Sequence, residues 1–163
     1  MTACAIAPDL SKAEAYLQAR EKFDSLLAQL RAPKTQRMTE SEVENLIEIE
    51  GREVLRCLLQ AHLDERGPGQ VAEPVIDKNQ REHRHQRLET CEIKSIFGNV
   101  ILERQGYGGR RIETLRPLDA ELNLPQKLYS HALQRRIAIT VAGQSYDTAV
   151  KTIREMNGVS IGK

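Results

Sequence analysis

The sequence has 163 residues and a formal net charge of +1; 40% of its residues are hydrophobic and 29% are charged. This length allows one domain or two small units that bury a limited core. No apolar run approaches the roughly 18 residues that a membrane helix needs, and the start MTACAIAPDL lacks the basic and long apolar regions of a secretory signal. Cys4, Cys57 and Cys91 are far apart and form no CxxC pair, so we expect reduced thiols in a soluble, cytoplasmic protein.

A first helix is predicted from Ser11 to about Arg31, ahead of Pro33. Ser11 and Glu14 have the spacing of a capping box, in which each side chain satisfies a free backbone amide. Apolar residues then recur every three or four positions, which is typical of one helix face: Tyr16, Ala19, Phe23, Leu26 and Leu30. This stripe is either a short coiled-coil seam or, as the blander alternative, a surface that packs against the next helix.

A second helix is predicted from Thr39 to Arg66, where Gly67-Pro68-Gly69 ends it. Thr39 and Glu42 form a second capping box. Six glutamates lie in its first half, which suits the positive end of a helix dipole but repels phosphate. We therefore expect residues 1–67 to form a helical hairpin that serves assembly rather than DNA binding.

Residues 68–86 are polar and interrupted by Pro68, Gly69 and Pro74, so we predict a linker there. Within it, REHRHQR contains His83 and His85 beside an acidic residue. The surrounding sequence supplies no further ligands at a usual zinc spacing, so no metal site is predicted. A flexible basic stretch that contacts phosphate, or one that is simply solvated, fits better.

A small antiparallel sheet is predicted over residues 87–116. Leu88–Phe97 and Val100–Gln105 alternate loosely between apolar and polar residues, and Gly98-Asn99 between them favours a tight turn. Arg110–Leu115 provides a third strand. The glycines of GYGG lack the Lys-Ser/Thr that follows a phosphate-binding loop, so that interpretation is rejected.

The last part, residues 117–163, is predicted to be a partial helix-turn-helix. An extended connector, Pro117–Pro125, leads to a helix that starts at Pro125 and stops at Gly143. A second helix begins after the N-cap Ser145 and ends at Asn157-Gly158.

In a helix-turn-helix, the helix that contacts the bases comes next, and here it would begin near Ser160 or Ile161, where the chain stops at Lys163. We therefore expect the N-terminal portion of a longer protein that handles DNA. The Ser145 helix would then have lost a packing surface and left apolar side chains partly exposed, namely Val150, Ile153, Met156 or Val159.

Charge is distributed unevenly along the chain. Residues 1–77 carry 9 Lys/Arg against 14 Asp/Glu, residues 78–116 carry 9 against 5, and residues 117–163 carry 6 against 4. A local basic surplus can be a solvated face, but beside a helix-turn-helix fragment it indicates phosphate binding that positions without specifying. The candidate phosphate contacts are Lys78, Arg81, Arg84, Arg87, Arg104, Arg110, Arg111, Arg135, Arg136, Lys151 and Arg154.

Six pieces of sequence follow one another between Ile96 and Gly158: IFGNV, ERQGYG, LRPLDAELNLP, LYSHALQRRIA, SYDTAV and NGV. In this order they resemble the N-terminal region of ISKra-type insertion-sequence transposases, and EGREVLRCLLQAHLDER within Met38–Gly67 also fits. Linked pieces in one order are far more specific than a single motif. The resemblance implies a mobile-element protein that binds its own DNA ends and recombines them at a metal-bound acidic triad. In the family that catalytic domain lies beyond the matched region, so no acidic residue of this chain is assigned to it.

Together these features predict an α+β fold, mostly α, made of a helical hairpin, a linker, a small sheet and an incomplete helix-turn-helix. The predicted function is that of a truncated transposase region for assembly and DNA binding in DNA transposition, without catalysis. Its expected partners are DNA, bound weakly and non-specifically, and a second copy or a full-length transposase; no cofactor or metal is expected. The alternative is a non-enzymatic interaction module that dimerises through its N-terminal helices and binds no DNA. An enzyme is disfavoured because the carboxylates are scattered over solvated helix faces.

Overall fold

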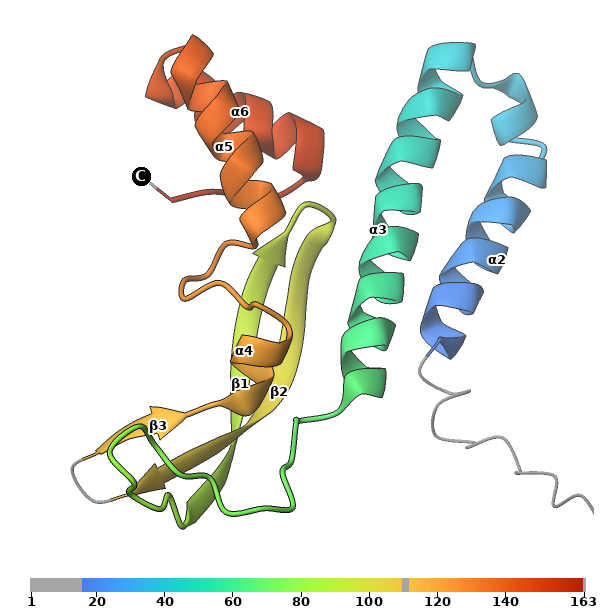
Figure 1. Cartoon of the computed structure of the whole chain (residues 1–163). Coiled ribbons are helices and arrows are strands. Elements are labelled where there is room, and N and C mark those ends of the chain that lie inside the picture. The colour runs from blue at the N-terminus through green and yellow to red at the C-terminus, as the bar shows by residue number, and fades with distance from the viewer. Residues whose placement is uncertain (1–15, 110–111, 163) are drawn as a thin grey trace, which may run out of the picture. The chain divides into compact units, whose positions relative to one another are not determined.

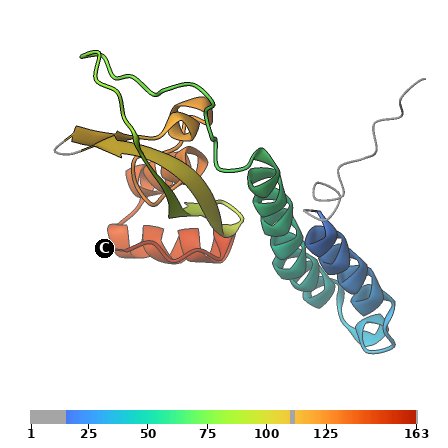
Figure 2. The same ribbon diagram turned by 90° about the horizontal axis from the view of Figure 1, so that it is seen from below.

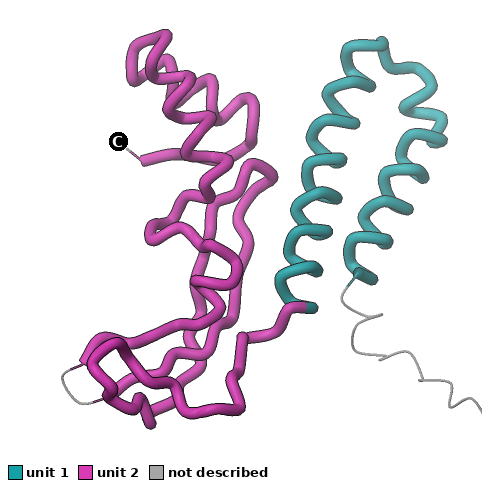
Figure 3. Tube along the Cα trace, in the orientation of Figure 1, with its two compact units in different colours: residues 1–65 teal, residues 66–163 magenta. Residues whose placement is uncertain are grey.

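The chain has an α+β fold that is mostly helical, as predicted. The computed structural model describes residues 16–109 and 112–162, and it divides the chain into two compact units, residues 1–65 and 66–163 (Figure 3). Their elements are α2 (Leu17–Arg31), a 3-10 turn η1 (Thr35–Arg37), α3 (Glu40–Arg66), β1 (His85–Ser95), β2 (Gly98–Gly109), β3 (Ile112–Leu115), α4 (Pro117–Glu121), α5 (His131–Gly143) and α6 (Tyr146–Asn157) (Figure 1).

The first unit is a hairpin of α2 and α3, which lie side by side in both views (Figures 1 and 2). The predicted capping box at the start of α3 is confirmed, because Thr39 N donates to Glu42 Oε2 (2.7 Å) and Glu42 N donates to Thr39 Oγ1 (3.4 Å). The capping box predicted at Ser11 and Glu14 lies outside the described residues. At the open end of the hairpin, the Tyr16 hydroxyl donates to Glu65 Oε2 (3.0 Å). This bond ties the start of α2 to the end of α3.

The apolar stripe predicted along α2 divides between two roles. Ala19 and Leu26 are buried, as are Cys57 and Ala61 of α3, so this part of the stripe is core within the hairpin. Phe23, one turn from Ala19, keeps 49% of its surface exposed. The hairpin therefore buries only part of this apolar stripe within one chain.

The second unit is organised around a three-stranded antiparallel sheet of order β1-β2-β3. Ser95 pairs with Gly98, so the turn consists of Ile96 and Phe97. The turn predicted at Gly98-Asn99 is wrong by two residues. Local hydrogen bonds explain the shift, because the Ser95 hydroxyl accepts from Phe97 N (3.1 Å) and donates to Gly98 O (2.8 Å).

Residues in the range expected as a linker pack on this sheet. Gln105 N donates to Pro68 O (2.7 Å), and Val71 N donates to the hydroxyl of Tyr107 (2.8 Å). Gly69 has φ +68°, and a Cβ there would lie 2.7 Å from Leu118 Cβ, so only glycine fits this close approach. The segment after α3 therefore belongs to the second unit.

The connector before α5 differs from the extended segment that the sequence predicted. Residues 117–121 form the short helix α4, which buries Leu118 against the sheet. The helix predicted to start at Pro125 begins at His131 instead, because the Ser130 hydroxyl caps it by accepting from Leu133 N (3.2 Å). Residues before the cap pair with β1, since Lys94 N donates to Leu128 O (2.7 Å) and Ser130 N donates to Lys94 O (2.9 Å).

Helix α6 has the predicted ends. The Ser145 hydroxyl accepts from Thr148 N (3.3 Å), and Gly158 adopts a left-handed φ of 65° that stops the helix. No residue between Val159 and Gly162 is helical, so the helix expected to begin near Ser160 or Ile161 is absent from these residues.

Side chains after α6 alternate between buried and exposed. Val159 and Ile161 join Leu133 and Ile153 in one apolar core, where all four are at most 6% exposed. Of the four residues among which partial exposure was expected, Met156 is exposed and Val150 is half-buried, whereas Ile153 and Val159 are buried. The physical reason is that the segment after α6 folds back and covers the helix itself.

Within the described ranges, every helix is too short or too polar to span a bilayer.

Candidate nucleic-acid interface

The candidate phosphate contacts fall into distinct structural settings. Nine of the eleven lie in the described part of the chain, whereas Arg110 and Arg111 lie outside it. All nine belong to the second unit. They differ in whether a protein group already holds the cation.

Four of these arginines are held by neighbouring side chains. Their partners are Asp119 for Arg104 (2.7 Å), Glu89 for Arg87 (2.5 Å), Glu82 for Arg84 (2.8 Å) and Asn157 for Arg136 (2.5 Å). The Arg104 side chain is only 18% exposed, so this guanidinium has little access to a ligand. A phosphate would have to compete with the protein for these four groups.

A second ion pair, between Glu89 and Arg116, lies beside that of Arg104 and Asp119, because Glu89 is the cross-strand partner of Arg104. Arg116 Nε donates to Glu89 Oε2 (2.7 Å), and this hydrogen bond holds the pKa of the Glu89 carboxyl below its usual value. Glu89 also contacts Arg87, so two cations share one carboxylate. These ion pairs hold β1 to Arg116, which lies between β3 and α4. Because a carboxylate already pairs with both arginines, the cluster is poorly suited to binding an anion.

Lys78 and Arg81 lie in a tight loop that Asp77 organises. Asp77 Oδ1 accepts from Asn79 N (2.8 Å) and Arg81 N (2.9 Å), and these bonds lower the pKa of the Asp77 carboxyl. The Lys78 and Arg81 side chains are exposed. The loop thus presents two cations at its surface on a backbone that its own aspartate fixes.

His83, beside this loop, is buried and structural. Its ring is 2% exposed, and Nδ1 lies 3.1 Å from the carbonyl oxygen of Tyr107, which can only accept. Nδ1 therefore carries the proton. His85, its expected neighbour in a metal-like pattern, is exposed on β1. Among the residues with described positions, no group of three His, Cys, Asp or Glu side chains could hold a metal ion.

Arg135, Lys151 and Arg154 are exposed on α5 and α6. The sequence of α5, HALQRRIAITVAG, has two arginines and no acidic residue. On α6, Lys151 and Arg154 are one turn apart and share the solvent side with Asp147 and Glu155. The charged side chains of α5 are therefore all basic, whereas α6 carries charges of both signs.

Arg136 joins the two helices. Its guanidinium donates to Asn157 Oδ1, and Asn157 Nδ2 donates to the carbonyl of Ile153 (3.1 Å). Asn157 is fully buried at the end of α6. This contact fixes the relative placement of the exposed cations on α5 and α6.

Lys94 makes a long-range contact that the sequence did not indicate. Its Nζ donates to Ser160 O (2.9 Å) and lies 6.0 Å from the centre of the Tyr129 ring. The Tyr129 hydroxyl accepts from Gly162 N (3.0 Å). Strand alternation placed Lys94 on a polar face, but its partner lies 66 residues later, so no local spacing could have revealed it.

In comparisons with known proteins, the chain matches no family model, no curated protein and no solved structure. Among the predicted phosphate contacts, the candidate interface consists of the exposed cations other than the four arginines held by side chains: Lys78, Arg81, Arg135, Lys151 and Arg154.

Proposed function

We propose that the chain is the DNA-binding and assembly region of an ISKra-type insertion-sequence transposase. The observation that carries the proposal is the ordered set of motifs between Ile96 and Gly158 that resembles this family. Catalysis would come from an acidic, metal-binding domain that the resemblance places outside the matched region. The chain itself would act without cofactor or metal, in the cytoplasm.

The ion pair of Arg104 with Asp119 supports this proposal. Arg104 belongs to the piece ERQGYG and Asp119 to LRPLDAELNLP, and the pair holds them together at 2.7 Å. The piece LYSHALQRRIA supplies Ser130, the cap of α5, and SYDTAV supplies Ser145, the cap of α6. Pieces that are linked in sequence thus contribute to one folded unit.

Electrostatics supports phosphate contact by this unit. Arg135 projects from a helix without acidic residues, and Lys78 and Arg81 project from an ordered loop. Exposed cations on a fixed scaffold bind the DNA backbone with little dependence on base sequence. We propose that the chain binds DNA weakly, through about four or five phosphates.

Fluorescence anisotropy with labelled duplexes at low salt tests the proposal. Neutralising four or five phosphates gives log K a slope of about −4 against log salt concentration. We expect similar affinities for a random duplex and for the end sequence of the parent element. A tight, sequence-selective complex would contradict the non-specific mode, and a lack of binding at low salt would contradict DNA binding altogether.

A further inference from the structure

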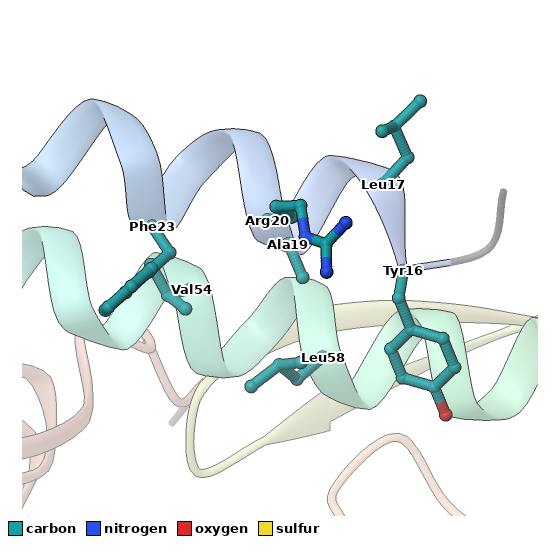
Figure 4. Close-up of a pocket in the computed structure, with 7 residues that line it drawn as sticks. All are labelled: Tyr16, Leu17, Ala19, Arg20, Phe23, Val54 and Leu58. Carbon is teal, nitrogen blue, oxygen red and sulfur yellow. The ribbon is translucent and has the colours of Figure 1, made fainter. Parts of the chain in front are cut away.

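The helical hairpin has an apolar groove along one side. Figure 4 shows Phe23 of α2 beside Val54 of α3, with Leu58 further along α3. Phe23 is 49% exposed and Leu58 is 40% exposed. Arg20 contributes a charged side chain to the same groove. The hairpin therefore leaves large apolar side chains in solvent on a defined face.

A second apolar depression lies near the other end of α3. Met38, Val43 and Ile47 line it together with Glu40 and Glu44, and Ile47 is 45% exposed.

Both depressions lie on the same face of α3. Val43, Ile47, Val54 and Leu58 are separated by four, seven and four residues, and this spacing places them on one helix face. They thus form one continuous stripe.

Gly51 lies midway along this stripe. Apart from its own helix backbone and chain neighbours, no heavy atom of the described residues lies within 4 Å of where a Cβ of Gly51 would be. Glycine inside a helix is unfavourable, and nothing in the described hairpin requires it. A small residue at the centre of an apolar stripe allows a second helix to approach closely.

The charges on the stripe complement each other end to end. Arg20 lies at the Leu58 end and Glu44 at the Ile47 end. A two-fold axis near Gly51 places the Ile47 end of one copy against the Leu58 end of the other. Each Arg20 then meets Glu44 of the second copy, and the contact occurs twice, as an isologous interface requires.

We propose that two copies of this chain pair antiparallel across this stripe, with the axis near Gly51, and form a four-helix bundle. Helix α3 has 27 residues and α2 has 15, so they are about 40 and 22 Å long and about 10 Å wide. Their combined face amounts to about 600 Å² per copy, which reaches the lower bound of stable protein interfaces. This pairing deepens the assembly role proposed above and rests on it. Because the test of the pairing contains no DNA, the pairing and the proposed DNA binding can each fail without the other.

Sedimentation equilibrium of the full chain over a range of concentrations tests the pairing. We expect a reversible dimer that Arg20→Glu and Glu44→Arg each weaken by about tenfold, because two like-charge contacts replace two attractive ones. The double variant restores the dimer. Glu21→Lys, an equally exposed change on another face of α2, leaves the dissociation constant unchanged.

Gly51→Leu separates pairing from folding. The helix has room for the new side chain, so the circular dichroism signal should be unchanged, and the thermal midpoint should be unchanged or higher at protein concentrations where the chain is monomeric. The dimer should weaken by about tenfold or more, since the side chain blocks close approach. A chain that remains monomeric at all concentrations would overturn the proposal and would indicate that another part of the same chain covers the stripe. A dimer that ignores both the charge exchange and Gly51→Leu would overturn it as well.

Discussion

Arg104 Nη1 and Asp119 Oδ2 form an ion pair at 2.7 Å that fastens the start of α4 to the middle of β2. The two side chains are 18% and 32% exposed, so solvent screens their attraction only in part. Arg104 Nε and Asp119 Oδ1 have no hydrogen-bond partner within the described chain. The pair is thus the main polar contact that each of them makes, and removing either partner leaves the other poorly compensated.

Arg104→Met should lower the free energy of unfolding by about 2 kcal/mol, because it leaves the Asp119 carboxylate uncompensated in a partly buried site. Urea denaturation followed by circular dichroism measures this change. Arg84→Met removes an ion pair whose arginine is 80% exposed and should cost less than about 0.5 kcal/mol. Equal effects of the two substitutions would show that burial does not determine how much these ion pairs contribute to the free energy of unfolding.

The ion pair of Glu89 with Arg116 predicts that the free energy of unfolding decreases in acid. Hydrogen bonds from Arg116 hold its pKa below the ordinary value of 4.5, so the unfolded chain takes up this proton at a higher pH than the folded chain. The stabilisation is complete above about pH 6 and is lost as the pH falls through 4.5 towards the lower folded-state pKa.

Urea midpoints at pH 7 and in steps down to pH 3.5 should therefore fall less steeply for Glu89→Gln than for the native chain. Glu103→Gln changes an exposed carboxylate on the same sheet and provides the control. Parallel curves for the native chain and Glu89→Gln would contradict this role of Glu89.

The same substitution should have opposite effects at two glycines. Gly51→Ala places a methyl group in open space within a helix and should stabilise the chain by about 1 kcal/mol. Gly158→Ala forces a side chain into a left-handed backbone with φ 65° and should destabilise by about 1 kcal/mol. Thermal unfolding at one protein concentration compares them. A loss of stability at both sites would contradict the open environment of Gly51.

Exposed and engaged cations should differ in their effect on DNA binding. Arg135→Gln and Arg154→Gln should each make the salt slope less negative by about 0.9 if each neutralises one phosphate. Arg56→Gln should leave the slope unchanged, because this arginine donates to Glu53 on the acidic helix α3. Anisotropy titrations at several salt concentrations measure all three. Equal changes for Arg56 and Arg135 would indicate a general charge effect.

Lys94 should control the segment that follows α6. Lys94→Met removes the hydrogen bond to Ser160 O and should speed amide exchange in residues 159–162 more than within α5. In the native chain, α6 amides near Ile153 should exchange as slowly as those of α5, because the two helices share one buried core. Hydrogen exchange read by mass spectrometry tests both statements. Rapid exchange throughout native α6 would contradict the packing of Val159 and Ile161 against it.

Local signals in the sequence were sufficient to predict several helix ends. The capping box of Thr39 and Glu42, the cap at Ser145 and the left-handed stop at Gly158 each act within one helical turn. Such contacts depend on residues only a few positions apart, so spacing alone predicts them. The mostly helical α+β class follows from these elements and from the period-two pattern around the hairpin turn.

The tertiary structure determined where the segments between the helices and strands lie. The sequence suggested that residues near Pro68 are a linker and that Val159 is exposed, but a hydrogen bond to Gln105 and burial beside Leu133 determine their actual positions. It likewise could not distinguish Arg104, engaged by Asp119, from Arg135, which is exposed. Charge and hydropathy are properties of single residues, whereas access to a ligand depends on which distant carboxylate or apolar surface the fold brings alongside. Sequence therefore determined which residues could bind phosphate, and only the packed chain determined which cations stay exposed to do so.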